Sequence, residues 1–219
     1  MANILIEKKV LSANDTIASK LRETFQKHKI FVINIVSSPG SGKTSLLEKT
    51  VQLLNKNIQT GIIAGDVQTE NDAKRIQKAG GKFVQPIETG GSCHLDAAMI
   101  EKSIAHFDLD KLDLLIIENV GNLVCPSCYD LGEDMKVVLL STTEGDDKPL
   151  KYPSMFRNSS VMVINKTDLL YYTDFKLDEV RKNALQINGT FEIFETSCKT
   201  SDGLNEWINW LTKKVSETG

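Results

Sequence analysis

The segment Ser37-Ser38-Pro39-Gly40-Ser41-Gly42-Lys43-Thr44 decides the fold, because its glycines and its final Gly-Lys-Thr are typical of a phosphate-binding loop. An apolar, β-branched run at 30–36 precedes the loop and predicts a buried strand. Residues 43–54 continue with apolar side chains at helical spacing. The loop therefore joins a strand to a helix N-terminus, where free backbone N–H groups and the helix dipole attract phosphate. The sequence thus predicts a nucleoside triphosphate site.

The residues of this loop have distinct expected roles. The two glycines let the backbone curl around the phosphates, and Lys43 is expected to reach the β- and γ-phosphates. The Thr44 hydroxyl is expected to bind Mg²⁺. Ser37 stands where such loops usually have their first glycine. The nucleotide-binding residues expected from this segment are Gly40, Ser41, Gly42, Lys43, Thr44 and Ser45.

A second motif, Asn165-Lys166-Thr167-Asp168, indicates that the base is guanine. It follows the buried-strand pattern of residues 160–164. A carboxylate at that strand end can accept hydrogen bonds from guanine N1 and the exocyclic amine, whereas adenine would leave it unpaired at high cost. The lysine stem is expected to cover the base and the asparagine to brace the loop. By analogy with other GTPases, Ser197 and Cys198 are expected to complete the base site.

Two further strand ends carry acidic residues. Glu118 follows the apolar run 112–117 and is expected to face the Mg²⁺ shell, with the Gly121 N–H near the γ-phosphate. Asp66 follows the strand predicted at 59–64 and is a second candidate for Mg²⁺ or for the attacking water; a capping or solvated carboxylate is its alternative. Lys43, Asp66 and Glu118 are therefore the expected catalytic residues. Asn122 stands where Ras-like GTPases have a glutamine that orients water.

Strands and helices alternate along the whole chain, which predicts an α/β fold with a largely parallel twisted sheet flanked by helices. We expect one P-loop GTPase domain over 1–219, with an N-terminal helical extension at 1–29. Strands are predicted at 30–36, 59–64, 82–85, 112–117, 136–141, 161–164 and 191–195. Helices are predicted at 14–28, 43–54, 69–79, 93–107, 176–185 and 204–215, the first capped by Asn14 or Asp15.

Composition narrows the function classes. The chain is 41% hydrophobic and 25% charged, which favours a folded core, and its net charge of −3 does not suggest a nucleic-acid partner. No apolar run approaches the length of a membrane span. Four cysteines without a signal-peptide pattern lead us to expect a reducing, cytoplasmic location.

Cysteine and histidine residues gather near the predicted phosphate side. Cys93 and His94 lie at a loop-to-helix junction, and Cys125 follows Glu118 by seven residues. Thiolate and imidazole suit Ni²⁺, Zn²⁺ or copper ions, although the spacing alone also allows structural cysteines. Adjacent Cys and His side chains are expected to diverge, and three ligands are too few for a closed tetrahedral site, so a site shared across a two-fold axis would resolve both problems. Cys128 could join the site or pair oxidatively with Cys125.

Several longer strings resemble the HypB family, the accessory GTPases for nickel insertion into nickel–iron hydrogenase. Beside the two nucleotide motifs, they are 65–69, 89–97 with its Cys-His-Leu-Asp, 118–126 with its Asn-Val-Gly-Asn-Leu-Val-Cys-Pro, and 144–148. The resemblance implies a SIMIBI-like P-loop GTPase that hydrolyses GTP slowly and dimerises in the GTP state. It also implies a nickel or zinc site at the dimer interface from Cys93, His94 and Cys125. The implied partners are a nickel-delivery accessory protein and the hydrogenase large subunit.

The chain departs from some family members, and other functions remain as alternatives. It has no N-terminal Cys-x-x-Cys-Gly-Cys motif and only three histidines, so N-terminal nickel capture and nickel storage are not expected. A urease-type nickel GTPase is the nearest alternative, but we expect a Cys-Pro-His string there. A metal-binding scaffold with a purely regulatory nucleotide site is another. A small-molecule kinase on the same fold is disfavoured by the guanine motif.

Overall fold

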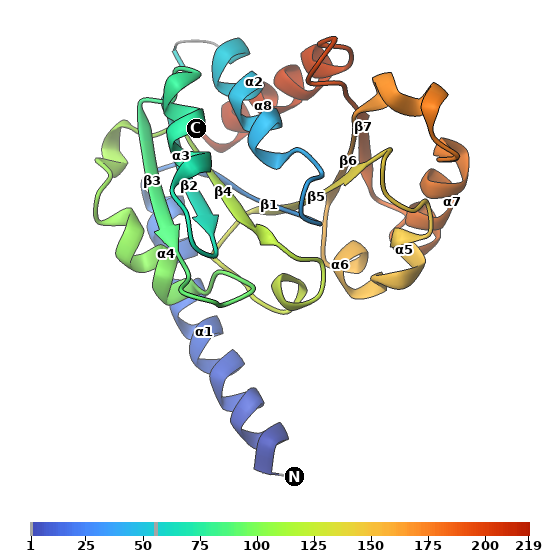
Figure 1. Cartoon of the computed structure of the whole chain (residues 1–219). Coiled ribbons are helices and arrows are strands. Elements are labelled where there is room, and N and C mark those ends of the chain that lie inside the picture. The colour runs from blue at the N-terminus through green and yellow to red at the C-terminus, as the bar shows by residue number, and fades with distance from the viewer. Residues whose placement is uncertain (1, 55–56) are drawn as a thin grey trace.

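A seven-stranded, wholly parallel sheet forms the centre of the molecule, in the order β3-β2-β4-β1-β5-β6-β7 (Figure 1). The structure is a computed structural model and describes residues 2–54 and 57–219, with side chains from residue 9 onward. Residue 1 of the expected extension 1–29 lies outside the described residues. The strands are β1 Phe31–Ser37, β2 Thr60–Asp66, β3 Phe83–Glu88, β4 Leu114–Gly121, β5 Met135–Ser141, β6 Val161–Asn165 and β7 Glu192–Glu195.

Helices cover both faces of the sheet, which is why the central strands are continuous apolar runs rather than alternating ones. The larger helices are α1 Ala2–Lys27, α2 Lys43–Leu53, α3 Asn71–Lys78, α4 Ala97–Ile104, α7 Leu177–Ile187 and α8 Leu204–Thr218. The shorter ones are α5 Lys148–Lys151, α6 Pro153–Arg157, η1 Leu109–Lys111, η2 Cys125–Ser127 and η3 Thr167–Tyr172. Side chains of α2, α3 and α8 pack on one face, and those of α1, α4, α6 and α7 pack on the other.

The strand order brings the predicted site residues together. β1 lies between β4 and β5, so the loops that follow these three strands meet at one edge of the sheet. In open α/β sheets this edge, at the point where the connections change direction, is where ligands bind. The phosphate-binding loop follows β1, and Glu118 lies in β4.

The seven predicted strands are all present, and the parallel sheet is confirmed. The boundaries of several helices differ from the prediction, and those of α1 and α4 differ most. α1 runs through Asn14 because this side chain does not cap the helix; it donates to the Asp130 carbonyl and accepts from the Ala97 N–H, both at 2.8 Å. α4 begins at Ala97 instead of Cys93, because the Asp96 carboxylate accepts the Met99 N–H at 2.8 Å and caps the helix there.

Within the part of the chain that the structure describes, no helix combines the length and the apolar composition that crossing a membrane requires.

Candidate nucleotide and metal sites

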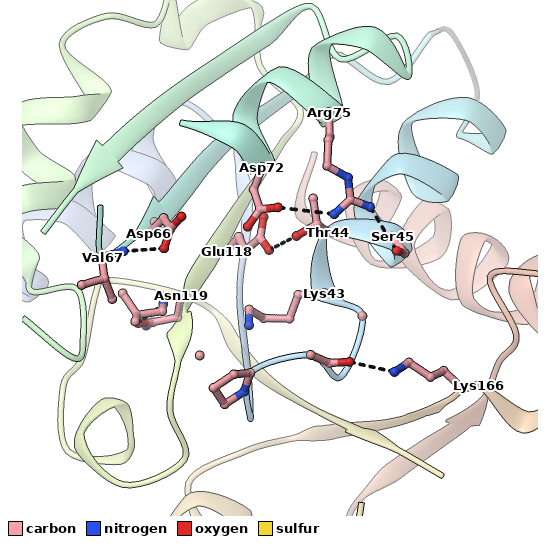
Figure 2. A pocket seen from close by; sticks show the side chains of 16 residues that line it. Lys43, Thr44, Ser45, Asp66, Val67, Asp72, Arg75, Glu118, Asn119 and Lys166 are labelled. Atoms are coloured by element: carbon pink, nitrogen blue, oxygen red, sulfur yellow. Dashed lines mark hydrogen bonds and ion pairs between the residues drawn. The ribbon is translucent and has the colours of Figure 1, made fainter. Parts of the chain in front are cut away.

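A pocket of about 500 Å³ opens at the carboxyl edge of the sheet, between the phosphate-binding loop, the end of β2 and the end of β4 (Figure 2). Most of the residues predicted for the phosphates and Mg²⁺ line this pocket. They are Gly40, Gly42, Lys43, Thr44, Ser45, Asp66, Glu118 and Gly121. Ser41 does not line it: its hydroxyl is buried within hydrogen-bond distance of both the Ser38 carbonyl and the Glu144 carboxylate.

The loop adopts a backbone that glycine permits. Gly42 has φ of 102°, in the left-handed region. A Cβ at this position would also lie 2.5 Å from Asn165 Nδ2, so a side chain would displace the asparagine of the guanine motif. Gly42 therefore allows the phosphate loop and the base loop to approach closely.

Lys43 points into the phosphate pocket (Figure 2). Its Nζ donates to the Ser37 hydroxyl at 3.0 Å, so the serine that replaces the usual first glycine provides a partner for this lysine. Burial lowers the pKa of Lys43, and the Glu118 carboxylate opposes that change. The ammonium is thus held next to the place where phosphate charge would be greatest.

Glu118 and Thr44 form a cation-binding arrangement. The Thr44 hydroxyl donates to Glu118 Oε1 at 2.8 Å. Glu118 is only 2% exposed, and its other oxygen, Oε2, is buried and accepts no hydrogen bond from the described residues. Burial raises the pKa of Glu118 to about 7. A divalent cation would satisfy this orphaned oxygen, so these residues fit Mg²⁺.

Asp66 lines the same pocket, but its carboxylate is engaged with its own loop. One oxygen accepts the Val67 N–H at 2.6 Å, and the other accepts the Thr69 hydroxyl. α3 begins only at Asn71, so Asp66 does not cap that helix.

The phosphate pocket also contains two charged residues that were not predicted from the sequence, Asp72 and Arg75 of α3. The Arg75 guanidinium donates to the Ser45 hydroxyl at 3.2 Å (Figure 2). It also donates to Glu48 at 2.8 Å. No motif marks these positions, because they lie on a polar helix whose docking against α2 depends on the tertiary fold.

The base motif lines a second pocket of about 420 Å³, which shares Gly42, Ser45 and Lys166 with the first. Asn165, Asp168 and Cys198 also line this second pocket. Ser197 is buried and donates from its hydroxyl to Asp168 Oδ1 at 2.6 Å. The residues predicted for the base are thus brought together. Ser197 does not line the pocket itself but orients the Asp168 carboxylate that does.

Two residues of this motif also hold the phosphate loop. Asn165 Nδ2 donates to the Ser41 carbonyl at 3.2 Å, and Lys166 Nζ donates to the Gly40 carbonyl at 2.8 Å. Cys198 donates to Asn165 Oδ1 at 3.4 Å, and burial raises the pKa of this thiol to about 11. The thiol is therefore neutral and serves as a hydrogen-bond donor.

Cys93, His94 and Cys125 converge, with one potential ligand atom of each lying within 4.8 Å of the other two. The two sulfur atoms are 2.9 Å apart, and Cys93 Sγ lies 3.8 Å from His94 Nδ1. The expectation that the adjacent Cys and His side chains diverge is wrong, because both residues precede α4 and lie on irregular backbone. The donor set of two thiols and one imidazole suits Ni²⁺ or Zn²⁺.

Two neighbouring side chains, Tyr129 and Asn122, support this cluster in a role that was not predicted from the sequence. The Tyr129 ring stacks on His94 with ring centroids 3.9 Å apart. Burial lowers the pKa of His94, which favours the neutral imidazole that binds metals. Asn122 Nδ2 donates to the Cys93 carbonyl at 3.2 Å, and Asn122 Oδ1 accepts the Val124 N–H, so this residue links the two loops.

Cys128 does not belong to the cluster formed by the other two loop cysteines. Its sulfur lies 3.6 Å from the Ser127 hydroxyl, and all four cysteines are free thiols. The prediction that left open a role for Cys128 in the metal site thus finds no support in this geometry.

Known proteins resemble the chain over nearly its whole length. The CobW/HypB/UreG nucleotide-binding domain matches residues 31–195. The hydrogenase maturation factor HypB of Azotobacter vinelandii is 47% identical over 95% of this chain and 69% of that protein. The hydrogenase/urease maturation factor HypB of Helicobacter pylori (strain J99) is 42% identical over 98% of this chain and 89% of that protein. A crystal structure of HypB from Helicobacter pylori in complex with nickel is 41% identical, with a TM-score of 0.88 over 94% of this chain and 96% of that chain.

Proposed function

Because the chain belongs to the HypB family of hydrogenase maturation factors, we propose that it is a GTP-binding and GTP-hydrolysing metallochaperone that assists nickel insertion into nickel–iron hydrogenase. One observation carries the proposal: β4 joins the two sites. Glu118 and Gly121 of this strand line the phosphate pocket, and Cys125 follows the end of the strand by four residues.

Guanine recognition rests on Asp168. Its carboxylate accepts hydrogen bonds from guanine N1 and the exocyclic amine, while Ser197 holds one of its oxygens in place. Lys166 covers the base with its stem and stays attached to the phosphate loop through its ammonium group. Cys198 and Asn165 complete the wall of this pocket.

Phosphate binding and hydrolysis use the loop, Lys43 and the carboxylates. Backbone N–H groups at Gly40–Ser45 and at Gly121 surround the phosphates, and Lys43 neutralises charge that develops in the transition state. Thr44 and Glu118, with Asp66 as a second candidate, would hold Mg²⁺, which would supply further neutralisation of the phosphate charge. The alternative role for Asp66 is to place the attacking water.

Hydrolysis by the isolated protein is slow. The position that carries a water-orienting glutamine in Ras-like GTPases carries Asn122 here, and this side chain is already bonded to Cys93 and Val124. The Asn122 side chain therefore binds the two loops that carry Cys93 and Cys125 and is not available to orient the attacking water. Loss of such assistance lowers GTPase rates by ~10³-fold or more.

Nickel, or zinc in its place, binds through Cys93, His94 and Cys125. Three protein ligands leave a tetrahedral or square-planar ion incomplete, so a second copy of the chain, dimerised in the GTP state, supplies the remaining ligands. A nickel-delivery accessory protein and the hydrogenase large subunit are the proposed partners. A reducing compartment such as the cytoplasm keeps the two thiols available for metal.

Two alternatives follow from particular observations. One relative is described as a hydrogenase/urease maturation factor, so delivery of nickel to urease is the nearer alternative. The engagement of Asp66 with its own loop favours the other, a metal-binding scaffold whose nucleotide site is regulatory and turns over negligibly. Single-turnover hydrolysis separates this scaffold from a GTPase.

The decisive experiment is anaerobic metal titration with sizing, in the presence of GDP or of a non-hydrolysable GTP analogue. We expect dimerisation and tighter nickel binding with the analogue, and Cys125→Ala should abolish tight binding while GTP affinity is retained. Cys128→Ala is the matched control and should behave as the wild type. Equal affinity and stoichiometry in both nucleotide states, unaffected by Cys125→Ala, would leave only a GTPase.

A further inference from the structure

Four buried polar side chains form a continuous line across the centre of the sheet. They belong to three neighbouring strands or their approaches: Asn119 on β4, Asn34 on β1, Glu133 just before β5, and Lys136 on β5. None of them is more than 9% exposed. The face on which they lie carries two apolar clusters, one under α1 and α4 and the other under α6 and α7. Because unpaired polar groups are costly in such surroundings, this line calls for an explanation.

The members of the line are bonded to one another in sequence. Asn119 Nδ2 donates to Asn34 Oδ1 at 3.2 Å, and Asn34 Nδ2 donates to Glu133 Oε1 at 3.0 Å. Glu133 pairs with Lys136 at 3.5 Å. Asn34 and Lys136 are also register partners on adjacent strands. Because each group is held by the next, every side chain has one orientation.

The β4 end of the line holds the loop that carries the first two potential ligands. Asn119 Oδ1 accepts the Leu95 N–H at 3.2 Å, and Leu95 directly follows His94. Asn119 also lines the phosphate pocket, one residue beyond Glu118 (Figure 2).

The β5 end holds the loop that carries the third potential ligand. Lys136 Nζ donates to the Pro126 carbonyl at 3.0 Å and to the Tyr129 carbonyl at 3.1 Å. Pro126 directly follows Cys125, and the Tyr129 ring stacks on His94. The line thus ends on both loops that form the cluster of Cys93, His94 and Cys125.

We propose that the line Asn119–Asn34–Glu133–Lys136 is a positioning device that sets the separation of the two metal-binding loops, with Asn34 as its central link. This inference rests on the proposed metal site. Asn34 is the most informative member, because it is completely buried and lines neither nucleotide pocket. It bonds to Asn119 on β4 and to Glu133 at the far end of the β4–β5 connection, eight residues beyond Cys125, and not to the segments that carry the potential ligands. Its effect on those segments therefore passes through the line.

The test uses Asn34→Leu, which keeps the size of the side chain and removes its hydrogen bonds. Thr50→Val is the matched control. Thr50 is equally buried, and its hydroxyl is bonded to Trp207 Nε1 at 3.0 Å on the opposite face of the sheet, away from both loops. GDP affinity and circular dichroism establish that each variant is folded. Should Asn34→Leu fail to fold, Lys136→Met interrupts the line at its other end.

Two measurements report on the loops. The first needs no metal: in a Cys128→Ser background, dibromobimane bridges Cys93 and Cys125, whose sulfur atoms are 2.9 Å apart. The second is nickel affinity by competition with a chromophoric chelator. We expect Asn34→Leu to lower the bridging yield to less than half and to weaken nickel binding by about 10- to 100-fold. GDP affinity should stay near that of the wild type, and Thr50→Val should change neither loop measurement.

The outcomes separate this inference from the proposed function. A folded Asn34→Leu protein with wild-type bridging and wild-type nickel affinity overturns the positioning role. Equal losses in Thr50→Val also overturn it, because they would indicate general destabilisation. If Asn34→Leu lowers bridging while even the wild type binds no nickel through Cys125, the positioning role stands and the proposed metal function fails.

Discussion

The Thr44 hydroxyl donates a hydrogen bond to Glu118 Oε1 across 2.8 Å and so joins the first turn of α2 to β4. Glu118 has a second oxygen that is buried without a hydrogen-bond partner among the described residues. The two residues therefore present a hydroxyl oxygen and an unpaired carboxylate oxygen, both of which can bind a cation.

Replacing this carboxylate should change how stability depends on pH. Burial raises the pKa of Glu118 from 4.5 to about 7, so without a cation the folded protein retains a proton that the unfolded chain releases. The free energy of unfolding should therefore fall as pH rises from 4.5 to about 7, by roughly 1–3 kcal/mol. In Glu118→Gln this fall should be absent. Denaturant titrations of the cation-free proteins across this pH range would measure it.

Mg²⁺ gives the corresponding control. With GDP and Mg²⁺ at pH 8, the wild type should gain more thermal stability than Glu118→Gln, because the uncharged amide oxygen of glutamine binds the ion more weakly than a carboxylate does. Equal gains in the two proteins would contradict the assignment of Glu118 to Mg²⁺.

Asp168→Asn should exchange guanine preference for xanthine preference. The amide can donate where the carboxylate accepts, and xanthine offers an acceptor at the position of the guanine amine. We expect GTP affinity to fall by ~10²-fold or more and binding of xanthosine triphosphate to increase. Direct titration with the guanine, xanthine and adenine nucleotides would measure both. The control is Asp174→Asn, which changes an exposed acid on the same segment and should leave the affinities for all three nucleotides unchanged. Strong ATP binding by the wild type would contradict the base assignment.

Lys43→Ala should abolish measurable GTP turnover. Lys43 lies in the phosphate pocket with its ammonium bonded only to the Ser37 hydroxyl among the described contacts, so it is available to the phosphates. The wild type itself should turn over far more slowly than ~10 s⁻¹ without a partner. Phosphate release under single-turnover conditions is the measurement. Lys74→Ala, which alters an exposed ion pair on α3, is the control and should retain the wild-type rate.

Cys198 should resist thiol reagents at neutral pH. Burial raises its pKa to about 11, and the reactive species is the thiolate. At pH 8 only ~10⁻³ of this thiol is ionised, so its alkylation should lag far behind that of the exposed Cys128 and should increase about tenfold per pH unit. Mass spectrometry after timed iodoacetamide treatment distinguishes the sites. GDP should slow the alkylation of Cys198 further, because this residue lines the base pocket. Rapid alkylation of Cys198 at pH 8 would show that the thiol is not held as the structure indicates.

The sequence by itself determined the features that are encoded in one contiguous stretch of residues. The loop around Gly42 and the motif that ends at Asp168 are contiguous, and each is flanked by its own strand. The central strands were predictable because buried parallel strands are continuous apolar runs. The edge strands β3 and β7 are only partly buried. The same local reasoning failed at Cys93, where helix-compatible residues follow but the cap at Asp96 places the helix start later.

Only the tertiary structure decided which distant side chains meet. The sulfur atoms of Cys93 and Cys125 approach to 2.9 Å because the strand order sets their two loops side by side. Arg75 reaches Ser45 through the docking of α3 on α2, and Asn34 reaches Lys136 through the register of β1 with β5. These contacts depend on strand order, register and helix docking, which arise from packing between segments far apart in the chain. A local sequence pattern shows which chemical groups a segment has and which element it forms. It does not show which residues of a distant strand or helix will lie next to it.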